Sequence, residues 1–312
     1  MKYKQRTISV IIPVFNEEDN VANIYKEVKD QLRKYGYEFI FVNDGSTDNT
    51  QKLVEKINVR DKKVKLINLS KNFGHQIAIT CGIDYTNGDA TIIMDADMQD
   101  PPALIPKMIS LWEKGFDVVY GIRSSRDSDG IVKKSTADIF YKILAKFSGT
   151  QIPANVGDFR LISKSVVLTL RQTREYQRFL RGIISWVGFT QIGIRYKRPK
   201  RYAGHSKYTS IKMIKLGLDA ILSFSFFPLR IASFLGLVTA IVAVIFIFYA
   251  LYVQSIGHTV RGWSSTIVLM LFLGSIQLIA IGIIGEYLGR IYEEVKKRPL
   301  YIIKSTKGVK TH

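Results

Sequence analysis

Residues 91–100 read Thr-Ile-Ile-Met-Asp-Ala-Asp-Met-Gln-Asp, an apolar, β-prone run that ends in a cluster of acidic side chains. Three earlier apolar runs, at residues 9–14, 39–42 and 64–67, resemble it, and the segments between the runs have helical periodicity. The first predicted helix is capped by Asn16 and runs to about Tyr35. The second is capped by Ser46 or Thr47, and the third spans residues 76–85. Strands that are apolar on both faces and alternate with helices are typical of a mostly parallel sheet with both faces covered. We therefore predict an α/β fold for about the first two thirds of the chain.

Polar side chains follow these strands at the sheet edge where such folds bind their ligands. Asn16 and Glu17 follow the first strand, Asp44 follows the second, and Asp95 and Asp97 follow the fourth. Converging carboxylates repel one another unless a cation or a hydrogen-bonding ligand lies among them. Asp95 and Asp97 would point to the same side of an extended backbone, and hard oxygen ligands of this kind suit Mg²⁺ or Mn²⁺.

An isolated Asp-x-Asp pattern is more often a turn or a helix cap than a metal site. Its place after a buried strand favours the metal site here, and Gln99 continues the two-residue spacing with a neutral oxygen. The sequence contains neither G-x-G-x-x-G nor G-x-x-x-x-G-K-[ST]. A bound metal rather than a glycine loop would then neutralise phosphates, which argues against a dehydrogenase or an ATPase.

The chain has 312 residues and a formal charge of +19, with 45 Lys and Arg against 26 Asp and Glu. This excess favours anionic partners such as nucleic acid, phosphorylated metabolites or an anionic membrane face, and charge alone does not choose among them. The single cysteine, Cys81, excludes an intrachain disulfide and fits a buried core position better than a reactive thiol. The apolar run after the basic N-terminus is too short for a signal peptide, so we expect the N-terminal domain in the cytoplasm.

Two long uncharged stretches, residues 231–253 and 263–285, are each long enough to cross a bilayer core of roughly 30 Å as a helix. We predict a transmembrane hairpin, against the alternative of a buried helical pair in a soluble protein. Basic residues follow the second stretch and Arg230 precedes the first, whereas the hairpin tip carries only Arg261, so both chain ends should lie in the cytoplasm.

The predicted organisation has four parts. They are a cytoplasmic domain at 1–207, an amphipathic juxtamembrane helix at 208–229, the hairpin at 230–285, and a cytoplasmic juxtamembrane helix with a basic tail at 286–312. The two amphipathic segments could lie in the membrane surface or pack against a neighbouring subunit.

Several motifs together carry a family likeness. They are Val-Ile-Ile-Pro-Val-Phe-Asn-Glu-Glu at 10–18, Val-Asn-Asp-Gly-Ser-Thr-Asp at 42–48, Asn-Phe-Gly-His at 72–75, Asp-Ala-Asp-Met-Gln-Asp-Pro-Pro at 95–102 and Gly-Asp-Phe-Arg-Leu at 157–161. The chain resembles family 2 glycosyltransferases of the GT-A fold, specifically the polyprenyl-phosphate glycosyltransferases related to dolichyl-phosphate mannose synthase. Residues 284–290 and 297–299 are typical of the bacterial two-span branch, so the likeness covers nearly the whole chain.

The resemblance implies roles for residues at the sheet edge. Pro13, Asn16 and Glu17 would line the nucleotide pocket, Asp44 would bind the base, and Asp95, Asp97 and Gln99 would hold Mg²⁺ or Mn²⁺. From the residues alone, Asn16 is a helix cap and Asp44 with Gly45 is a tight turn, and both interpretations are compatible with the implied roles. His75 is a further candidate in a loop of the nucleotide pocket.

Asp158 resembles the residue that this family proposes as general base, and Gly157 would allow the backbone to approach the sugar. A phosphate monoester is already largely dianionic near neutral pH, so orienting the acceptor or the sugar is an equal alternative for Asp158. A structural pair with Arg160 also stays open. For the lipid phosphate the family pattern suggests Arg201 and Lys207, with Arg123 and Arg126 joining when their loop closes. The alternative for this basic segment is nonspecific attraction to anionic headgroups.

The resemblance implies transfer of a hexose from a UDP-sugar, first of all UDP-glucose, to undecaprenyl phosphate or another polyprenyl phosphate, by a metal-dependent inverting displacement. The expected enzyme is a multi-pass cell-membrane protein of cell-envelope glycan biosynthesis, homo-oligomeric and tetrameric by family analogy, with no nucleic-acid partner. Alternatives are the same reaction with UDP-N-acetylglucosamine, a processive polysaccharide synthase, and a non-catalytic membrane scaffold that binds nucleotide sugars. Processive enzymes normally carry Gln-x-x-Arg-Trp, which the nearest stretch, residues 177–181, lacks.

Overall fold

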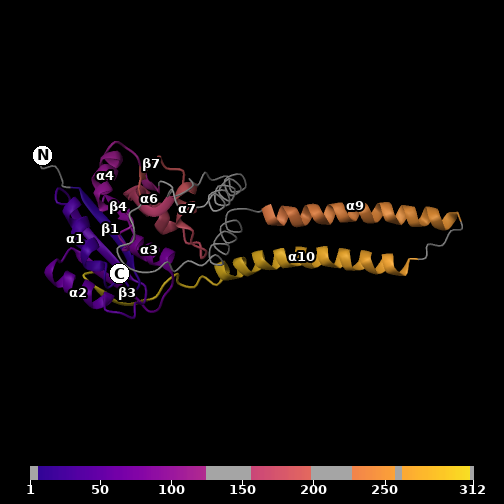
Figure 1. The fold of residues 1–312 in the computed structure, drawn as a ribbon, viewed down its shortest axis with the longest axis horizontal. Helices are drawn as coiled ribbons and strands as arrows, with labels where there is room; N and C mark the ends of the chain where they lie inside the picture. The colour runs from indigo at the N-terminus through magenta and orange to yellow at the C-terminus, as the bar shows by residue number, and fades with distance from the viewer. Residues whose placement is uncertain (1–5, 124–155, 198–226, 257–261, 310–312) are drawn as a thin grey trace. The chain divides into compact units, whose positions relative to one another are not determined.

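A computed structural model of the chain describes residues 6–123, 156–197, 227–256 and 262–309 (Figure 1). The chain forms two compact units: the head, which comprises residues 1–213 and 299–312, and the hairpin unit, residues 214–298.

The head is built on an eight-stranded sheet with the order β7-β5-β6-β4-β1-β2-β3-β8. The strands are β1 Thr7–Val14, β2 Gly36–Asn43, β3 Val64–Leu69, β4 Ala90–Ile93, β5 Val118–Arg123, β6 Val156–Ser163, β7 Gln191–Tyr196 and β8 Ile303–Lys307. Strands β4, β1, β2 and β3 are parallel neighbours, whereas β6 is antiparallel to both β4 and β5, and β8 is antiparallel to β3. The predicted α/β fold with a mostly parallel sheet is confirmed, and an antiparallel strand lies directly beside the acidic end of β4.

Helices cover both faces of the sheet. The helices of the head are α1 Val21–Gln31, α2 Thr50–Arg60, α3 His75–Asp84, the 3₁₀ turn η1 Pro102–Leu104, α4 Ile105–Glu113, α6 Lys164–Gln172 and α7 Leu180–Trp186. Along β2, Phe39 and Phe41 pack in one core with α1 and α4, while Ile40 and Val42 pack in a second core with Cys81 of α3. Alternate residues of a strand point to opposite faces, so β2 is apolar throughout because both faces are buried. Burial also raises the pKa of Cys81, as expected for a core thiol.

Two predicted helix starts are wrong, and the loops after β1 and β2 explain why. Asn16 lies outside α1, with a left-handed φ of 54°, and its side chain accepts a hydrogen bond from the backbone N–H of Thr47 (2.8 Å). Ser46 Oγ accepts from the backbone N–H of Asn16 (3.0 Å), and α2 begins only at Thr50. The polar side chains that seemed to be helix caps instead join the two loops to each other.

The C-terminal tail adds β8, a strand that was not predicted. Its sequence, Ile-Lys-Ser-Thr-Lys, is mostly polar and lacks the apolar pattern of the other strands. It pairs with β3 at the sheet edge, where lysines are compatible with exposure, and Ser305 accepts a hydrogen bond from Asn68 Nδ2 (2.9 Å). Tyr301 donates to Asp84 of α3 (2.7 Å), so the tail is attached at two places.

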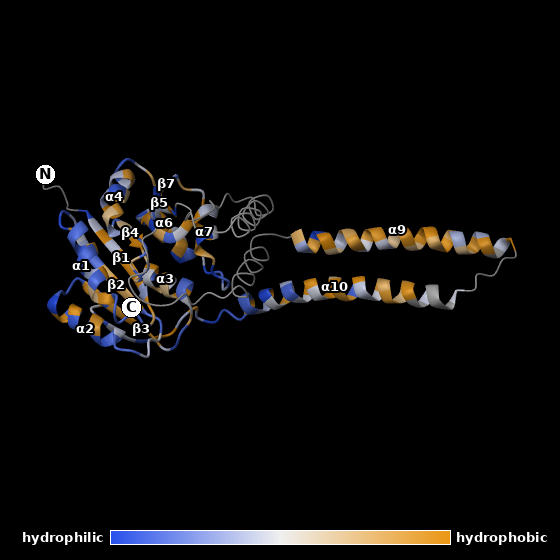
Figure 2. Cartoon of the chain, in the orientation of Figure 1, coloured by the Kyte–Doolittle hydropathy of each residue, from blue (hydrophilic) through white to orange (hydrophobic). Residues whose placement is uncertain are grey.

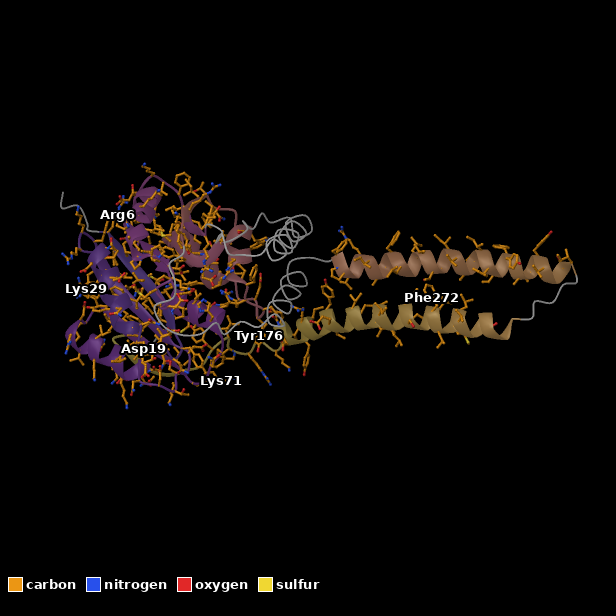
Figure 3. The ribbon with its side chains drawn as sticks, viewed as in Figure 1. Arg6, Asp19, Lys29, Lys71, Tyr176 and Phe272 are labelled. Carbon is orange, nitrogen blue, oxygen red and sulfur yellow. The ribbon has the colours of Figure 1, made fainter. Side chains whose placement is uncertain are left out.

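The hairpin unit consists of α9 Phe227–Ser255 and α10 Trp263–Val295, which run side by side (Figure 1). Both are long and apolar enough to cross a membrane, with mean hydropathies of 2.8 and 2.4 over their candidate spans (Figure 2). Large apolar side chains such as Phe272 are exposed along the helices (Figure 3). The predicted second span ends at residue 285, whereas helix α10 continues to Val295. On this last part of α10, Arg290 and Glu286 form an ion pair of 3.1 Å. Most of the predicted helix at 208–229 lies outside the described residues.

One carboxylate joins three elements of the head. Asp61, just after α2, accepts hydrogen bonds from Lys29 Nζ (2.8 Å) and Tyr25 OH (2.7 Å) of α1 and from Tyr37 OH (3.0 Å) of β2. Lys29 is labelled in Figure 3. Burial alone would raise the pKa of Asp61, but the bonds from Lys29 and Tyr25 outweigh it and hold the pKa well below its ordinary value.

We predict that Asp61→Asn lowers the free energy of unfolding of the head by ~1–3 kcal/mol at neutral pH, because a charge-assisted network is lost. The lower end is expected, since the Lys29 side chain is 40% exposed. The folded-state pKa lies below the unfolded one, so this stabilisation is complete above about pH 4 and fades as the pH falls towards the folded-state value. Denaturant unfolding of the detergent-solubilised chain measures both effects.

The matched control is Asp30→Asn, which removes a more exposed ion pair with Arg33. We expect little change from it. Equal losses for the two variants, or a difference that does not shrink on acidification, would contradict the role of Asp61.

Candidate active site

Two carboxylates lie beside the same histidine at the acidic end of β4: Asp95 and Asp158 are each 3.3 Å from His75 Nε2. Strands β4 and β6 are antiparallel, and Ile93 opposite Arg160 is the last pair before these two residues. Asp158 is almost completely buried, with 7% of its side chain exposed. Like charges that are close together disfavour each other's ionised form. The arrangement therefore requires positive charge beside it.

His75 and Arg181 supply that charge. His75 Nε2 lies 3.3 Å from Asp95 Oδ1 and 3.3 Å from Asp158 Oδ2. Arg181 donates from Nε to Asp158 Oδ1 (2.8 Å) and from Nη2 to Oδ2 (3.0 Å). Burial would lower the pKa of His75, but the charges of Asp95 and Asp158 raise that pKa to about 9. Burial likewise opposes ionisation of Asp158, yet Arg181 and His75 hold the pKa of this carboxyl below its ordinary value.

The partners of Asp158 differ from the pair considered in the sequence. Asp158 binds Arg181 rather than Arg160, whose Nη2 donates to the carbonyl of Gly157 (2.8 Å). Gln76 Nε2 is a further donor to Asp158 Oδ2 (3.2 Å). Because Arg181 and His75 hold the pKa of Asp158 below its ordinary value, this carboxylate is a weak base, which suits an orienting role better than proton abstraction.

The residues around Asp95 fit a divalent cation. Asp95 Oδ1 is buried and accepts no hydrogen bond, although it lies 3.3 Å from His75 Nε2. Burial and the nearby carboxylates Asp100, Asp158 and Asp97 raise the pKa of Asp95, although His75 opposes them. A cation would relieve this repulsion.

Asp97 and Gln99 lie in the turn that follows Asp95. Asp97 Oδ1 accepts from the backbone N–H of Gln99 (3.1 Å), and Gln99 is buried. Within the described ranges no three side chains of the types His, Cys, Asp and Glu are grouped closely enough to hold a metal. Oxygens from Gln99 or from a bound diphosphate would have to complete the ligand set.

The residues predicted to line the nucleotide pocket lie at the ends of β1 and β2. Pro13 is buried within β1 and pairs with Val42. Asn16 is exposed in the loop beyond it, and the backbone N–H of Glu17 donates to Thr50 Oγ1 (2.8 Å) at the start of α2. The structure thus brings these three residues to the same edge as Asp95, on neighbouring parallel strands.

Asp44 holds the loop that carries His75. Its two carboxylate oxygens accept the backbone N–H groups of Phe73 (2.7 Å) and Gly74 (2.9 Å). Gly45 has a φ of 76°, and a Cβ there would lie 2.8 Å from the backbone of residues 71 and 72, so glycine lets the two loops touch. Contact of Asp44 with a base stays a prediction, and the structure adds this bracing role.

A second buried cluster lies on the β5 side. Tyr196 OH donates to Asp100 Oδ1 (2.6 Å), Arg123 Nε donates to Tyr196 OH (3.2 Å), and Arg123 Nη2 lies 3.5 Å from Asp100 Oδ1. A Cβ at Gly157 would lie 2.5 Å from Arg123 Nη2, so the absent side chain makes room for this guanidinium. Arg123 is therefore close to the Asp158 segment, as its predicted role requires.

Three predicted residues, Arg126, Arg201 and Lys207, lie outside the described residues. Conversely, Arg181, Gln76 and Tyr196 belong to the site and were not predicted. Arg181 lies in the 177–181 stretch, which was considered only for a motif that it lacks. Nothing local in the sequence marks these residues, because their partners are distant along the chain.

Comparison with known proteins agrees with this geometry. The family model for glycosyl transferase family 2 matches residues 9–171, and the model for the GtrB C-terminal hairpin matches residues 227–291. The prophage bactoprenol glucosyl transferase homolog of Escherichia coli K12 is 45% identical, covering 96% of this chain and 99% of that protein. The bactoprenol glucosyl transferase of Shigella phage SfX is 43% identical, with the same coverage. The glycosyltransferase YkcC of Bacillus subtilis is 44% identical over 96% of this chain and 94% of its own length.

These similarities extend over both the head and the hairpin. They confirm the family likeness, the GT-A type of α/β domain and the glycosyltransferase activity that the motifs implied. The chain belongs to glycosyltransferase family 2, among the polyprenyl-phosphate glycosyltransferases that carry a GtrB hairpin.

Proposed function

We propose that this enzyme transfers glucose from UDP-glucose to a polyprenyl phosphate, undecaprenyl phosphate, at the cytoplasmic face of the cell membrane. The observation that carries the proposal is the pair of carboxylates at the ligand-binding edge of the sheet, the buried Asp158 and the partly exposed Asp95, on either side of His75. The names of the E. coli and phage relatives support the choice of sugar and lipid. The two apolar helices would keep the head at the membrane, where a lipid acceptor is found.

The reaction is a single displacement with inversion. A phosphate oxygen of the lipid attacks the anomeric carbon of glucose as the bond from that carbon to the UDP oxygen breaks. Asp95, Asp97 and Gln99 would hold Mg²⁺ or Mn²⁺, which when bound would neutralise the diphosphate. Asp158 would hold the sugar or the acceptor in line, because the lipid phosphate needs little deprotonation.

Basic residues would bind the acceptor phosphate. Arg123 lies beside Gly157, the residue before Asp158. Arg126, Arg201 and Lys207 are predicted to bind the acceptor phosphate together with Arg123. The positive residues at both ends of the hairpin favour a cytoplasmic head. The chain is also predicted to form a homo-oligomer, a tetramer by family analogy. Measuring the mass of the active detergent-solubilised enzyme tests this prediction.

A transfer assay with labelled UDP- and GDP-sugars on polyprenyl phosphate tests the donor and the acceptor together. We expect UDP-glucose to be the best donor and transfer to stop when a chelator is added. Better use of UDP-N-acetylglucosamine would contradict the choice of sugar.

Asp97→Ala should abolish transfer because a carboxylate ligand of the cation is lost, and normal transfer by this variant would overturn the metal assignment.

Asp158→Asn should lower kcat about 100-fold or more, by loss of an orienting charge in the transition state, and change KM for UDP-glucose little. Steady-state kinetics with each substrate varied in turn measure both constants. An unchanged kcat would leave Asp158 a structural role only.

Replacing Arg201 or Lys207 by Ala should raise KM for the lipid about 10-fold or more, because one charge-assisted bond to the phosphate is lost. KM for UDP-glucose should stay the same. An equal loss in binding of the nucleotide, measured by titration with UDP, would contradict their placement at the acceptor.

A further inference from the structure

The segment that precedes α7 is fixed to the rest of the head by a buried arginine. Arg178 is 8% exposed, and its Nε donates to Thr80 Oγ1 of α3 (3.2 Å). Its other guanidinium nitrogens donate to the carbonyls of Thr173 and Leu170, at the end of α6. One side chain thus binds α3 and the end of α6 shortly before α7, the helix that carries Arg181, which restricts where α7 can begin.

Gln76 joins the starts of α3 and α7 directly. Its Oε1 accepts the backbone N–H of Leu180 (3.2 Å), while its Nε2 donates to Asp158 Oδ2 (3.2 Å). The residue before Gln76 is His75 and the residue after Leu180 is Arg181, and both bind Asp158. Two helix starts are therefore joined to each other at the point where each presents a nitrogen-bearing side chain to the same carboxylate.

The Arg181 fork restrains the orientation of Asp158. With Nε on one oxygen and Nη2 on the other, at 2.8 and 3.0 Å, rotation of the carboxylate would break both bonds. The charge of Arg181 also offsets the repulsion between Asp158 and Asp95 across β4 and β6. Oδ2 already accepts from Arg181 Nη2 and Gln76 Nε2 and lies 3.3 Å from His75 Nε2. Oδ1, which accepts from Arg181 Nε, is therefore the oxygen with capacity to accept a hydrogen bond from a substrate.

We propose that Arg181 is a positioning residue for glycosyl transfer, which acts by fixing the Asp158 carboxylate in the orientation that the substrate meets. This inference rests on the proposed function and adds a residue to its machinery. Arg181 touches no reacting atom in this scheme. Its effect on the rate passes entirely through Asp158, which makes the inference testable by a double-mutant cycle.

The experiment measures kcat and KM of the full-length enzyme in detergent, with UDP-glucose and polyprenyl phosphate. Arg181→Gln should lower kcat about 10- to 100-fold, as for other residues that orient a functional group through hydrogen bonds, and leave both KM values within about twofold. Arg181→Lys should recover part of kcat, since it restores the charge without the fork. The double variant Asp158→Asn with Arg181→Gln should be no slower than Asp158→Asn alone.

Arg174→Gln is the matched control. Arg174 makes the same two-point contact with Asp84, at 2.9 and 3.0 Å, in a more exposed part of the head, and its loss should leave kcat unchanged. Two results would overturn the inference. One is a double variant whose loss of kcat is the product of the losses in the two single variants, and the other is a loss of kcat in Arg174→Gln equal to that in Arg181→Gln. If Arg181→Gln fails to fold, the same cycle is run with Arg181→Lys and judged by the same criterion.

The outcomes separate the inference from the function on which it rests. Wild-type enzyme that transfers glucose together with an Arg181→Gln variant of normal kcat would overturn the positioning role alone. If the wild-type enzyme released no UDP from any UDP-sugar in the presence of polyprenyl phosphate, the proposed function would be overturned, and this inference with it.

Discussion

The repulsion between Asp95 and Asp158 is the constraint around which the site is arranged. The antiparallel pairing of β4 and β6 places the two carboxylates at the same edge of the sheet, where one of them is nearly inaccessible to water. Burial makes an unpaired negative charge costly, so the surrounding structure must supply cations and donors. His75 lies between the two carboxylates, and Arg181 binds the more buried one. The oxygen of Asp95 that accepts no hydrogen bond would suit a divalent cation.

Much of the head serves to hold these compensating groups in place. The loop with His75 is bound by Asp44 through two backbone N–H groups, and the absence of a side chain at Gly45 allows the loops to touch. Arg181 is placed by Arg178 and by the link from Gln76 to Leu180. The loops after β1 and β2 are joined in the same way, through Asn16 and Ser46. Such mutual bracing fixes polar groups before a substrate arrives, which lowers the cost of reorganisation during a reaction.

The tail connects the hairpin unit to the sheet a second time. After α10 ends at Val295, the chain returns to the head and adds β8 beside β3, with Tyr301 bound to Asp84 of α3. The chain therefore passes from the head into the hairpin unit after residue 213 and returns to the head at residue 299.

The sequence by itself determined the alternation of strands and helices, the acidic strand ends and the two long apolar helices. These features follow from local patterns: a strand buried on both faces must be apolar throughout, and a helix that crosses a bilayer must be long and uncharged. It could not determine that Asn16 and Ser46 join two loops instead of capping helices, or that the polar tail pairs with β3. Nor could it determine that Asp158 binds Arg181, Gln76 and His75 rather than Arg160. Only the tertiary structure decided these pairings, because each joins residues that are far apart in the chain, and the charge balance of a buried site depends on which of them meet.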